Sequence, residues 1–414
     1  MLLGFCCVLL VKCIDRQNEE AEKKPLPSNV LALSSTVQFD AFSGTEKCMS
    51  CHKDLYQSHL ATAHFRTSAP ASEKTILGSF QQGTNEFVFS EHTRVRMEKR
   101  DSGFYQVAYV DGAEKVARRF DIVVGSGAKG QTSIYWHDGH LYQLPITYFS
   151  PAREWSNSPG FPMKATFNRA VTVRCLECHT SFVQSTAGVG GQPDSFDSSR
   201  IVYGVSCEKC HGPGARHVDY HQSHPEEKTA QFIVNTGRLS RQQQLDLCAL
   251  CHGGRLEKTT PSFTFIAGDT LSNYFKVDST SPDPNEIDLH GNQYGLLRAS
   301  KCFRNSQALT CSSCHDSHKN ERGQEAVFSQ RCRQCHGGAH ATAASCPMKA
   351  RIGASINSNC IDCHMPAKPS KAIAVFLPGA NQPLAALIHS HYISVYPAET
   401  EKFLAAKKSA SHSR

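Results

Sequence analysis

The sequence predicts an α+β protein, in which a mostly helical and irregular scaffold carries a small inserted antiparallel β module. The motif Cys-x-x-Cys-His occurs seven times, and the linkers between the last six copies resemble short helices and turns. Residues 53–174 contain no copy and hold short β-branched and aromatic runs instead. Only 40% of the 414 residues are hydrophobic, which is modest for a chain of this length.

The seven motifs, numbered 1 to 7 in chain order, use 14 of the 19 cysteines. Two thiols three residues apart, followed at once by a histidine, form the signature of c-type haem attachment, in which the histidine becomes the proximal iron ligand. Zinc ribbons and dithiol redox sites also use Cys-x-x-Cys pairs, but they do not require a histidine after each second cysteine. We therefore expect seven covalently attached haems c.

The predicted attachment residues are Cys48, Cys51, Cys175, Cys178, Cys207, Cys210, Cys248, Cys251, Cys311, Cys314, Cys332, Cys335, Cys360 and Cys363. The predicted proximal ligands are His52, His179, His211, His252, His315, His336 and His364. Seven porphyrins would supply much of the apolar core, so we expect folding to depend on them, as it depends on the metal in small metal-bound domains.

Fourteen histidines lie outside the motifs, enough to give every iron a second axial histidine. His217 follows a Gly-Pro-Gly turn after motif 3, and His318 is too close to His315 to bind the same iron from the opposite face. The predicted distal ligands are His64, His217, His290, His318, His340 and one of His389 and His391, of which we choose His391. Six further histidines are expected to be solvated or structural rather than ligands: His92, His137, His140, His221, His224 and His412. His59 is left open between a ligand and a surface residue.

The β module is expected between motifs 1 and 2, with hairpin turns at Asp111-Gly112 and Asp138-Gly139. Gly125–Gly130 spells G-x-G-x-x-G, but a strand-like run follows it, whereas a dinucleotide site needs a helix there. We therefore expect no nucleotide. Helices are expected over Lys53–His64 and Leu239–Cys251, and loops over Pro145–Pro162 and Thr259–Leu297.

The predicted organisation is a leader (1–13), a flexible linker (14–45), a first haem segment (46–74), the β module (75–162), a multihaem domain with six motifs (163–397) and a disordered tail (398–414). Covalent haem attachment takes place outside the cytoplasm, so an export signal is expected. The apolar run Leu2–Val11 is too short to span a bilayer. Cys13 after it suggests a lipoprotein; plain cleavage and an uncleaved anchor are the alternatives.

The formal charge of +7 does not indicate nucleic-acid binding, because each haem would add two propionates. With seven haems the protein would be about neutral when oxidised and about −7 when reduced. Two cysteines outside the motifs and the leader, Cys302 and Cys346, are predicted to form a disulfide in the oxidising compartment. Met348 is the one methionine considered as an axial ligand.

Three stretches carry a resemblance to a known family: Cys207-x-x-Cys-His-Gly-Pro-Gly-x-x-His217, the Cys-x-x-Cys-His-x-x-His318 site and Cys360-x-x-Cys-His-Met-Pro366. They resemble the multihaem cytochromes c that include the nitrifier tetrahaem carrier, hydroxylamine oxidoreductase and pentahaem nitrite reductase. The resemblance covers roughly Glu46 to Pro397. It implies haems packed in stacked and perpendicular pairs, with distal histidines from elsewhere in the chain, and so supports the six distal candidates above.

Two departures separate this chain from the enzymes of that group. No Cys-x-x-Cys-Lys motif marks a catalytic haem, and no tyrosine can be matched to the one cross-linked in hydroxylamine oxidoreductase. The resemblance therefore favours a periplasmic or surface-anchored heptahaem protein that passes electrons between redox partners, such as quinol-linked proteins or other cytochromes.

Two alternatives remain open. One is an oxidoreductase that acts on a small nitrogen or sulfur compound at a haem with an open axial position, with Arg94, Arg96, Lys99 and Arg100 attracting the anion. The other is a haem-based sensor or gas-binding protein.

Overall fold

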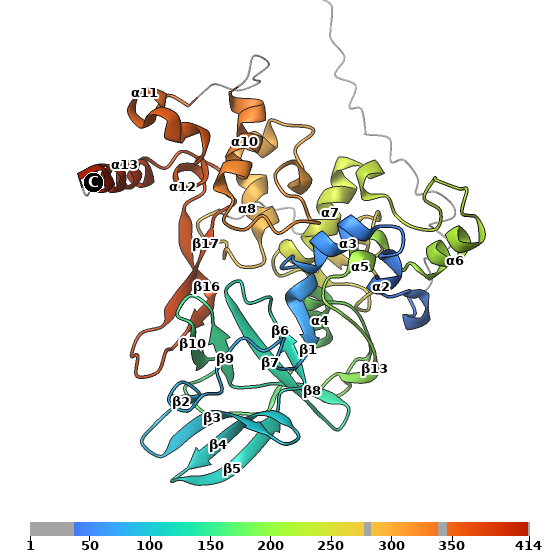
Figure 1. The fold of residues 1–414 in the computed structure, drawn as a ribbon, viewed down its shortest axis with the longest axis vertical. Helices are drawn as coiled ribbons and strands as arrows, with labels where there is room; N and C mark the ends of the chain where they lie inside the picture. The colour runs from blue at the N-terminus through green and yellow to red at the C-terminus, as the bar shows by residue number, and fades with distance from the viewer. Residues whose placement is uncertain (1–36, 277–282, 338–345, 413–414) are drawn as a thin grey trace, which may run out of the picture.

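The computed structural model describes residues 37–276, 283–337 and 346–412. Figure 1 shows the larger β-sheets at one end and the short helices that carry the motifs at the other, with a long hairpin running between them. The protein is α+β, as the sequence predicts. The leader, Cys13, the first part of the predicted linker and His340 lie outside the described residues.

Four strands after motif 1 form an antiparallel meander in the order β2–β3–β4–β5. They are β2 (Glu86–Val88), β3 (Thr93–Arg100), β4 (Gly103–Val110) and β5 (Ala113–Arg119). Asp111 and Gly112 join β4 to β5 with φ of 50° and 79°, as a two-residue hairpin turn requires. Val95 and Met97 alternate with more exposed residues and are fully buried, so this sheet has one core face.

A second, nine-stranded sheet contains the path β1–β6–β7–β8–β13–β12, with β9, β10 and β11 attached at its side. Its strands are β1 (Ser68–Pro70), β6 (Ile122–Val124), β7 (Gly130–His137), β8 (His140–Gln143), β9 (Ile146–Phe149), β10 (Glu154–Asn157), β11 (Arg169–Ala170), β12 (Thr180–Thr186) and β13 (Ser195–Tyr203). The sheet therefore extends past the predicted bounds 75–162 on both sides. Strands β12 and β13 follow motif 2 directly, so the β module and that motif share one framework.

The glycine run connects β6 to β7 without a helix, as predicted. Gly125 and Gly127 have φ of 106° and 79°, and a Cβ on Gly125 would lie 2.7 Å from the Gly130 carbonyl oxygen. These glycines therefore allow a tight connection. Residues 145–162 differ from the predicted loop, because they form β9 and β10 and bury Trp155 between the sheets.

Two 12-residue helices end in a motif, α7 (Arg241–His252) and α10 (Glu325–His336), and α7 lies close to the predicted Leu239–Cys251. Ser240 and Gln243 form a capping box at its start. The other helices that flank or carry motifs are α2 (Thr45–Cys48), α3 (Lys53–Leu60), α4 (Val173–His179), α5 (Cys207–His211), α6 (Ala215–Ser223), α8 (Gln293–Ala299), α9 (Lys301–Arg304), α10 (Glu325–His336), α11 (Lys349–Ile352) and α12 (Ile361–His364). Short 3₁₀ turns η1 (Phe39–Ala41), η2 (Phe65–Thr67), η3 (Thr236–Arg238), η4 (Leu271–Asn273), η5 (Cys311–Ser313) and η6 (Gly353–Asn357) complete this part.

Residues 259–297 are less irregular than predicted. They contain η4, the strand β15 (Phe275–Lys276), which pairs with β14 (Glu257–Lys258), and the start of α8. The apolar side chains of this region, such as Leu271 and Phe275, bury against α7. Sequence reasoning missed these elements because each is only two to seven residues long.

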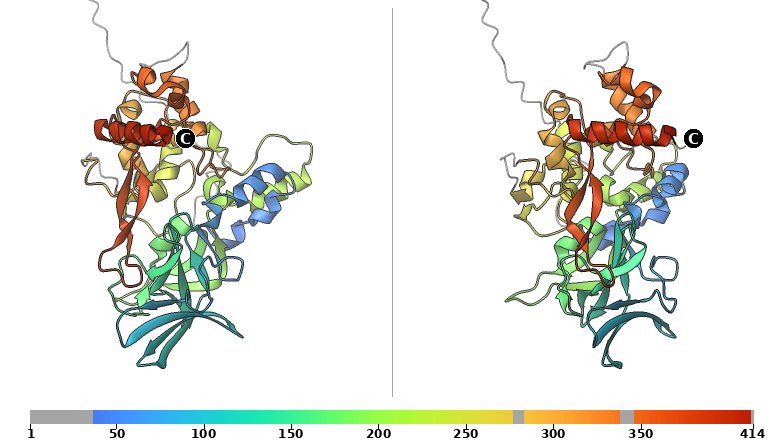
Figure 2. Two further views of the ribbon diagram at one scale, coloured as in Figure 1. Left: turned by 60° about the vertical axis from the view of Figure 1, so that its left-hand side comes forward. Right: turned by 90° about the vertical axis from the view of Figure 1, so that its left-hand side faces the viewer.

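The chain ends with the hairpin β16 (Ala367–Val375) and β17 (Leu384–His389), followed by α13 (Pro397–His412). The helix differs from the disordered tail predicted for 398–414. Figure 2 shows the hairpin reaching from the helical end towards the sheets, where Val375 and Ala386 pack on Phe149 of β9. Among the described residues, no helix combines the length and apolarity that a membrane span needs.

The Asn157 side chain of β10 fastens this hairpin to the sheet. Its Oδ1 accepts a hydrogen bond from the Phe376 backbone N–H at 2.6 Å, and the Asn157 backbone N–H donates to the Phe376 carbonyl oxygen at 3.2 Å. Asn157→Ala should leave the Phe376 N–H without its partner and lower the free energy of unfolding by about 1–3 kcal/mol, measured by denaturant unfolding of the holo-protein. The exposed Asn320→Ala serves as control and should change it by less than about 0.5 kcal/mol. Equal effects of the two substitutions would contradict the fastening role.

Candidate functional site

Helical turns present the paired cysteines of most motifs. Motifs 2, 3, 4 and 6 lie entirely within α4, α5, α7 and α10. Because residues three apart share one face of a helix, both thiols of such a motif project to the same side, and the histidine follows at the end of the helix. This arrangement is what attachment of two thiols to one porphyrin edge requires.

Thiols of different motifs meet in pairs. Four such pairs of side chains interact directly: Cys48 with Cys207, Cys178 with Cys251, Cys248 with Cys311, and Cys332 with Cys360. At longer range Cys210 interacts electrostatically with Cys248, and Cys314 with Cys332. The neighbouring motifs are therefore 1–3, 3–4, 4–5, 5–6 and 6–7, with motif 2 beside motif 4.

Packing of the elements agrees with this order. Helix α4 contacts α7, α7 contacts η5, and α10 contacts α12. The motifs thus form one unbroken series, 1–3–4–5–6–7, with a branch to motif 2 at motif 4. The order in space differs from the order in sequence because β12 and β13 separate motif 2 from motif 3.

Histidine rings face one another in pairs with nearly the same separation. The ring centroids lie 6.1 Å apart in three pairs that join a motif histidine to a predicted distal ligand: His211 with His318, His252 with His64, and His315 with His391. A transition metal binds imidazole nitrogen at about 2 Å, so two axial imidazoles on one metal place their ring centroids about 6 Å apart. The three pairs therefore fit bis-histidine haem iron.

The second ring nitrogen of two of these histidines is hydrogen-bonded to a neighbouring oxygen. His211 Nδ1 lies 2.8 Å from the Val234 carbonyl oxygen, and His252 Nδ1 lies 3.0 Å from Gln293 Oε1. Metal-bound histidines characteristically donate their other ring N–H in this way, which fixes the tautomer and the ring orientation. The bonds leave Nε2 of both histidines for the iron.

Motifs 1 and 2 have distal candidates at a longer, electrostatic range. His217 interacts with His52, and its Nδ1 lies 2.8 Å from the Gln231 carbonyl oxygen. Burial, together with the neighbouring His290, lowers the pKa of His179 to about 4. Both proximal histidines therefore have the predicted partner nearby.

His59, left open by the sequence, is buried at 7% exposure. Its ring centroid lies 6.3 Å from that of His318, almost as close as His211. His59 Nε2 lies 2.9 Å from the Val205 carbonyl oxygen and donates to it, while its buried Nδ1 has no hydrogen-bond partner among the described residues. Because His211 belongs to a motif and His59 does not, we pair His318 with His211.

Two glutamates inside motifs tie separate segments together, and sequence reasoning missed them. Glu208 of motif 3 accepts hydrogen bonds from the backbone amides of Ser43, Gly44 and Gly214 at 2.8, 3.1 and 2.7 Å. This contact orders the end of the predicted flexible linker. The signal that could have indicated this contact is the charged residue between the two cysteines of motif 3, which haem attachment would hold in place.

Glu177 of motif 2 is the more deeply buried of the two, at 1% exposure. It accepts hydrogen bonds from Lys258 Nζ at 2.7 Å, Arg174 Nη1 at 2.9 Å and the Phe263 amide at 2.9 Å. Burial opposes ionisation, but Lys258 and the Phe263 amide outweigh it and lower the pKa of Glu177. The carboxylate therefore stabilises the position of motif 2 in its ionised form.

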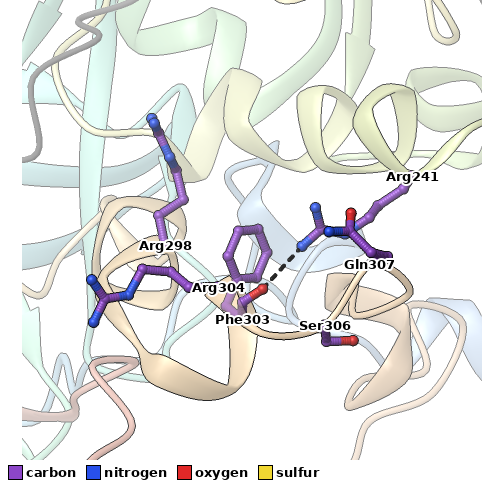
Figure 3. A pocket seen from close by; sticks show the side chains of 6 residues that line it. All are labelled: Arg241, Arg298, Phe303, Arg304, Ser306 and Gln307. Carbon is purple, nitrogen blue, oxygen red and sulfur yellow. Dashed lines mark hydrogen bonds between the residues drawn. The ribbon is translucent and has the colours of Figure 1, made fainter. Parts of the chain in front are cut away.

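A cavity of about 370 Å³ lies beside motif 5, between α7, α8 and α9. Its lining residues are Arg241, Arg298, Phe303, Arg304, Ser306 and Gln307 (Figure 3). The Arg241 guanidinium lies 4.3 Å from the centroid of the Phe303 ring and donates to the Phe303 and Leu309 carbonyl oxygens. Phe303 also packs in one cluster with Cys311. An aromatic wall with nearby guanidinium groups suits a haem edge that bears carboxylates.

Two sequence-based hypotheses are wrong. Cys302 and Cys346 are both free, because Cys302 lies near Cys335 and Cys314 whereas Cys346 lies near Cys363. Strand β3, which carries the basic residues, lies at the β-sheet end of the molecule (Figure 1), and these residues are paired with carboxylates. The ion pairs are Arg94 and Arg96 with Glu86 at 4.0 and 3.3 Å, Lys99 with Glu73 at 3.2 Å, and Arg100 with Glu98 and Glu114 at 2.8 Å.

Comparisons with known proteins agree with this arrangement. Residues 153–212, which include motifs 2 and 3, match the family model described as Cytochrome c554 and c-prime. The fold is similar to the crystal structure of outer cell wall cytochrome OcwA, with a TM-score of 0.52 and 16% sequence identity over 87% of this chain and 81% of that chain. The chain has the fold of a multihaem c-type cytochrome. No curated protein matches it.

His318→Ala tests the pairing of axial ligands. Because Cys207, Cys210 and His211 are untouched, haem attachment should persist, while one iron loses its sixth ligand and gives a high-spin ferric band with a changed potential. Two controls, His59→Ala and the exposed His92→Ala, should keep the wild-type spectrum. An unchanged spectrum in His318→Ala, or a high-spin band in His59→Ala, would show that the assignment is incorrect.

Glu177→Ala tests the buried carboxylate. Removing one member of a buried ion pair should lower the free energy of unfolding by about 3–5 kcal/mol, whereas Glu257→Ala in the exposed Glu257–Lys276 pair should cost less than about 1 kcal/mol. Since the pKa of Glu177 is lowered in the folded protein, its stabilisation is complete above the unfolded pKa of about 4.3 and is lost as pH falls below it. Denaturant unfolding at several pH values measures both effects, and equal losses for the two variants would exclude this role.

Proposed function

We propose that the protein is a heptahaem c-type cytochrome that transfers electrons between redox partners outside the cytoplasm. The observation that carries this proposal is the unbroken series of neighbouring motifs, 1–3–4–5–6–7, with motif 2 beside motif 4. When bound, each haem supplies a reversible one-electron couple at its iron. A continuous series of such couples is what conduction through the molecule needs.

The chain's own residues supply the remaining properties of an electron carrier. Paired thiols hold each attachment site in place, and facing imidazoles such as His252 and His64 would keep the coordination the same in both redox states. Anchored nitrogens, such as His211 Nδ1 on the Val234 carbonyl, hold the ring orientation. The buried ion pairs around Glu177 keep motif 2 beside motif 4. These side chains would therefore change position little when a haem is reduced.

The compartment and partners belong to the same proposal. Covalent haem attachment and the Leu2–Val11 leader support export, and the similar fold comes from an outer cell wall cytochrome. Lipid attachment at Cys13 would tether the protein in the periplasm or at the cell surface. The partners we propose are quinol-linked proteins or other cytochromes.

A reductase is the second candidate, and it has less support. It needs a basic approach to an open haem, and the arginines and lysine first considered for this lie on β3 in ion pairs with Glu86, Glu73, Glu98 and Glu114. The chain also has no Cys-x-x-Cys-Lys motif.

The haem count is directly measurable. Mass spectrometry of the exported, purified protein should show seven covalent haem additions, one for each motif. The Cys175→Ser/Cys178→Ser variant, which lacks motif 2, serves as control and should show six. Five or fewer additions in the wild type would contradict the heptahaem assignment.

Selective removal of motifs tests the branched order. The Cys248→Ser/Cys251→Ser variant removes motif 4, the branch point, so electrons introduced by a substoichiometric reducing pulse should no longer equilibrate between motifs 1 and 3 and motifs 5 to 7. Removal of motif 2, a side branch, should leave a single fast equilibration phase. Transient absorption measures the phases, and six haems by mass in each variant confirms that the rest of the protein is loaded. Equal slowing in both variants would overturn the order.

A further inference from the structure

Positive charge is concentrated in the last part of the chain. Residues 325–414 contain ten Lys and Arg against four Asp and Glu, a formal net charge of +6 out of +7 for the whole protein. The preceding 324 residues are therefore almost neutral, at +1. This segment includes motifs 6 and 7, the far end of the series of motifs.

The structure gathers the helices of this basic segment at one end of the molecule, from which the hairpin β16–β17 reaches towards the sheets. Helices α10, α11, α12 and α13 lie together opposite the β-sheets in all views (Figures 1 and 2). Arg333 in α10 lies between the two cysteines of motif 6 and is exposed, as are Cys335 and His336 beside it. Lys371 of β16 is also exposed. We call this region, α10–α13 with β16, the basic end.

Part of the positive charge at the basic end is available to a partner. Arg351 and Lys402 are paired with Glu401 and Glu399 at 3.3 and 2.9 Å. Lys368 lies over the Tyr396 ring at 5.3 Å. Arg333 and Lys371 form no ion pair within the described part of the chain.

The charges of the haems would increase the difference in net charge between residues 1–324 and residues 325–414. Two propionates and one ferric iron give an oxidised haem about −1, so five haems bring residues 1–324 to about −4 and two haems leave residues 325–414 at about +4. A protein that is nearly neutral overall would then be strongly dipolar. Such a charge distribution orients an approaching charged partner and raises its association rate.

We propose that the basic end is the docking surface for an acidic redox protein, which exchanges electrons with the protein through motifs 6 and 7. This rests on the proposed electron-transfer function. Charge complementarity specifies the occupant as acidic, and the series of motifs ends there. A membrane surface fits less well, because helix α13 buries its Leu404 within the protein and has few other large apolar side chains to insert into lipid.

Charge-reversal variants of the holo-protein test the proposal with a small anionic oxidant, hexacyanoferrate(III), in place of the unidentified partner. In the step, one electron passes from a ferrous haem to the complex, which becomes hexacyanoferrate(II), and no bond forms or breaks. Arg333→Glu/Lys371→Glu should lower the second-order rate constant at low ionic strength by about tenfold or more. Lys74→Glu/Lys115→Glu changes two exposed lysines near the β-sheets by the same net charge and should have a much smaller effect.

Retention of the oxidised protein on a cation-exchange resin gives a readout that does not depend on electron transfer. The wild type and the Lys74/Lys115 variant should be retained despite a net charge near zero, and the Arg333/Lys371 variant should elute early. Equal effects of the two variants on rate and retention would overturn the docking surface while leaving electron transfer intact. Binding of the wild type to vesicles containing anionic lipid, abolished by Arg333→Glu/Lys371→Glu, would instead assign the basic end to a membrane surface and equally overturn it. Absence of any haem oxidation in the wild type would refute the proposed function itself.

Discussion

The separation of about 6 Å between facing imidazole rings is the constraint on which the rest of the arrangement depends. It recurs at 6.1 Å in three pairs that draw on five separate segments of the chain, since His315 and His318 share one segment. To keep His64 opposite His252, the segment after motif 1 must cross the end of α7. To keep His391 opposite His315, the chain after motif 7 must return to motif 5. With iron bound, the distal histidines would therefore hold distant segments of the polypeptide together around the motifs.

The β-sheets and the terminal hairpin fix the positions of the motifs relative to one another. Strands β12 and β13 connect motif 2 to motif 3, and β1 lies just after the distal candidate His64. The hairpin β16–β17 links motif 7 to β9 and β10 through Asn157 and the Phe149 cluster. The buried carboxylates of Glu177 and Glu208, which lie inside motifs 2 and 3, add hydrogen bonds between these motifs and other segments of the chain. A rigid frame of this kind limits the rearrangement that accompanies each change of redox state.

Sequence reasoning predicted the parts of this design that have a local signature. Seven Cys-x-x-Cys-His motifs, the two Asp-Gly hairpins and the capped helix before motif 4 are each set by neighbouring residues. The ring separations for His64, His318 and His391 fit their predicted distal role. Which motif histidine each of them faces depends on long-range packing that no spacing in the sequence encodes. For the same reason the sequence missed β12, β13 and the hairpin contact to Phe149. The free Cys302 and Cys346 show the limit of compartment-based reasoning, since each lies near a different motif.

Anomalous diffraction at the iron edge from crystals of the loaded protein tests the central claim most directly. We expect an iron midway between the rings of His252 and His64, of His211 and His318 and of His315 and His391. We also expect seven irons in the neighbour order 1–3–4–5–6–7, with the iron of motif 2 beside that of motif 4. An iron placed away from these ring pairs, or a break in the series between motifs 3 and 4, would contradict the account.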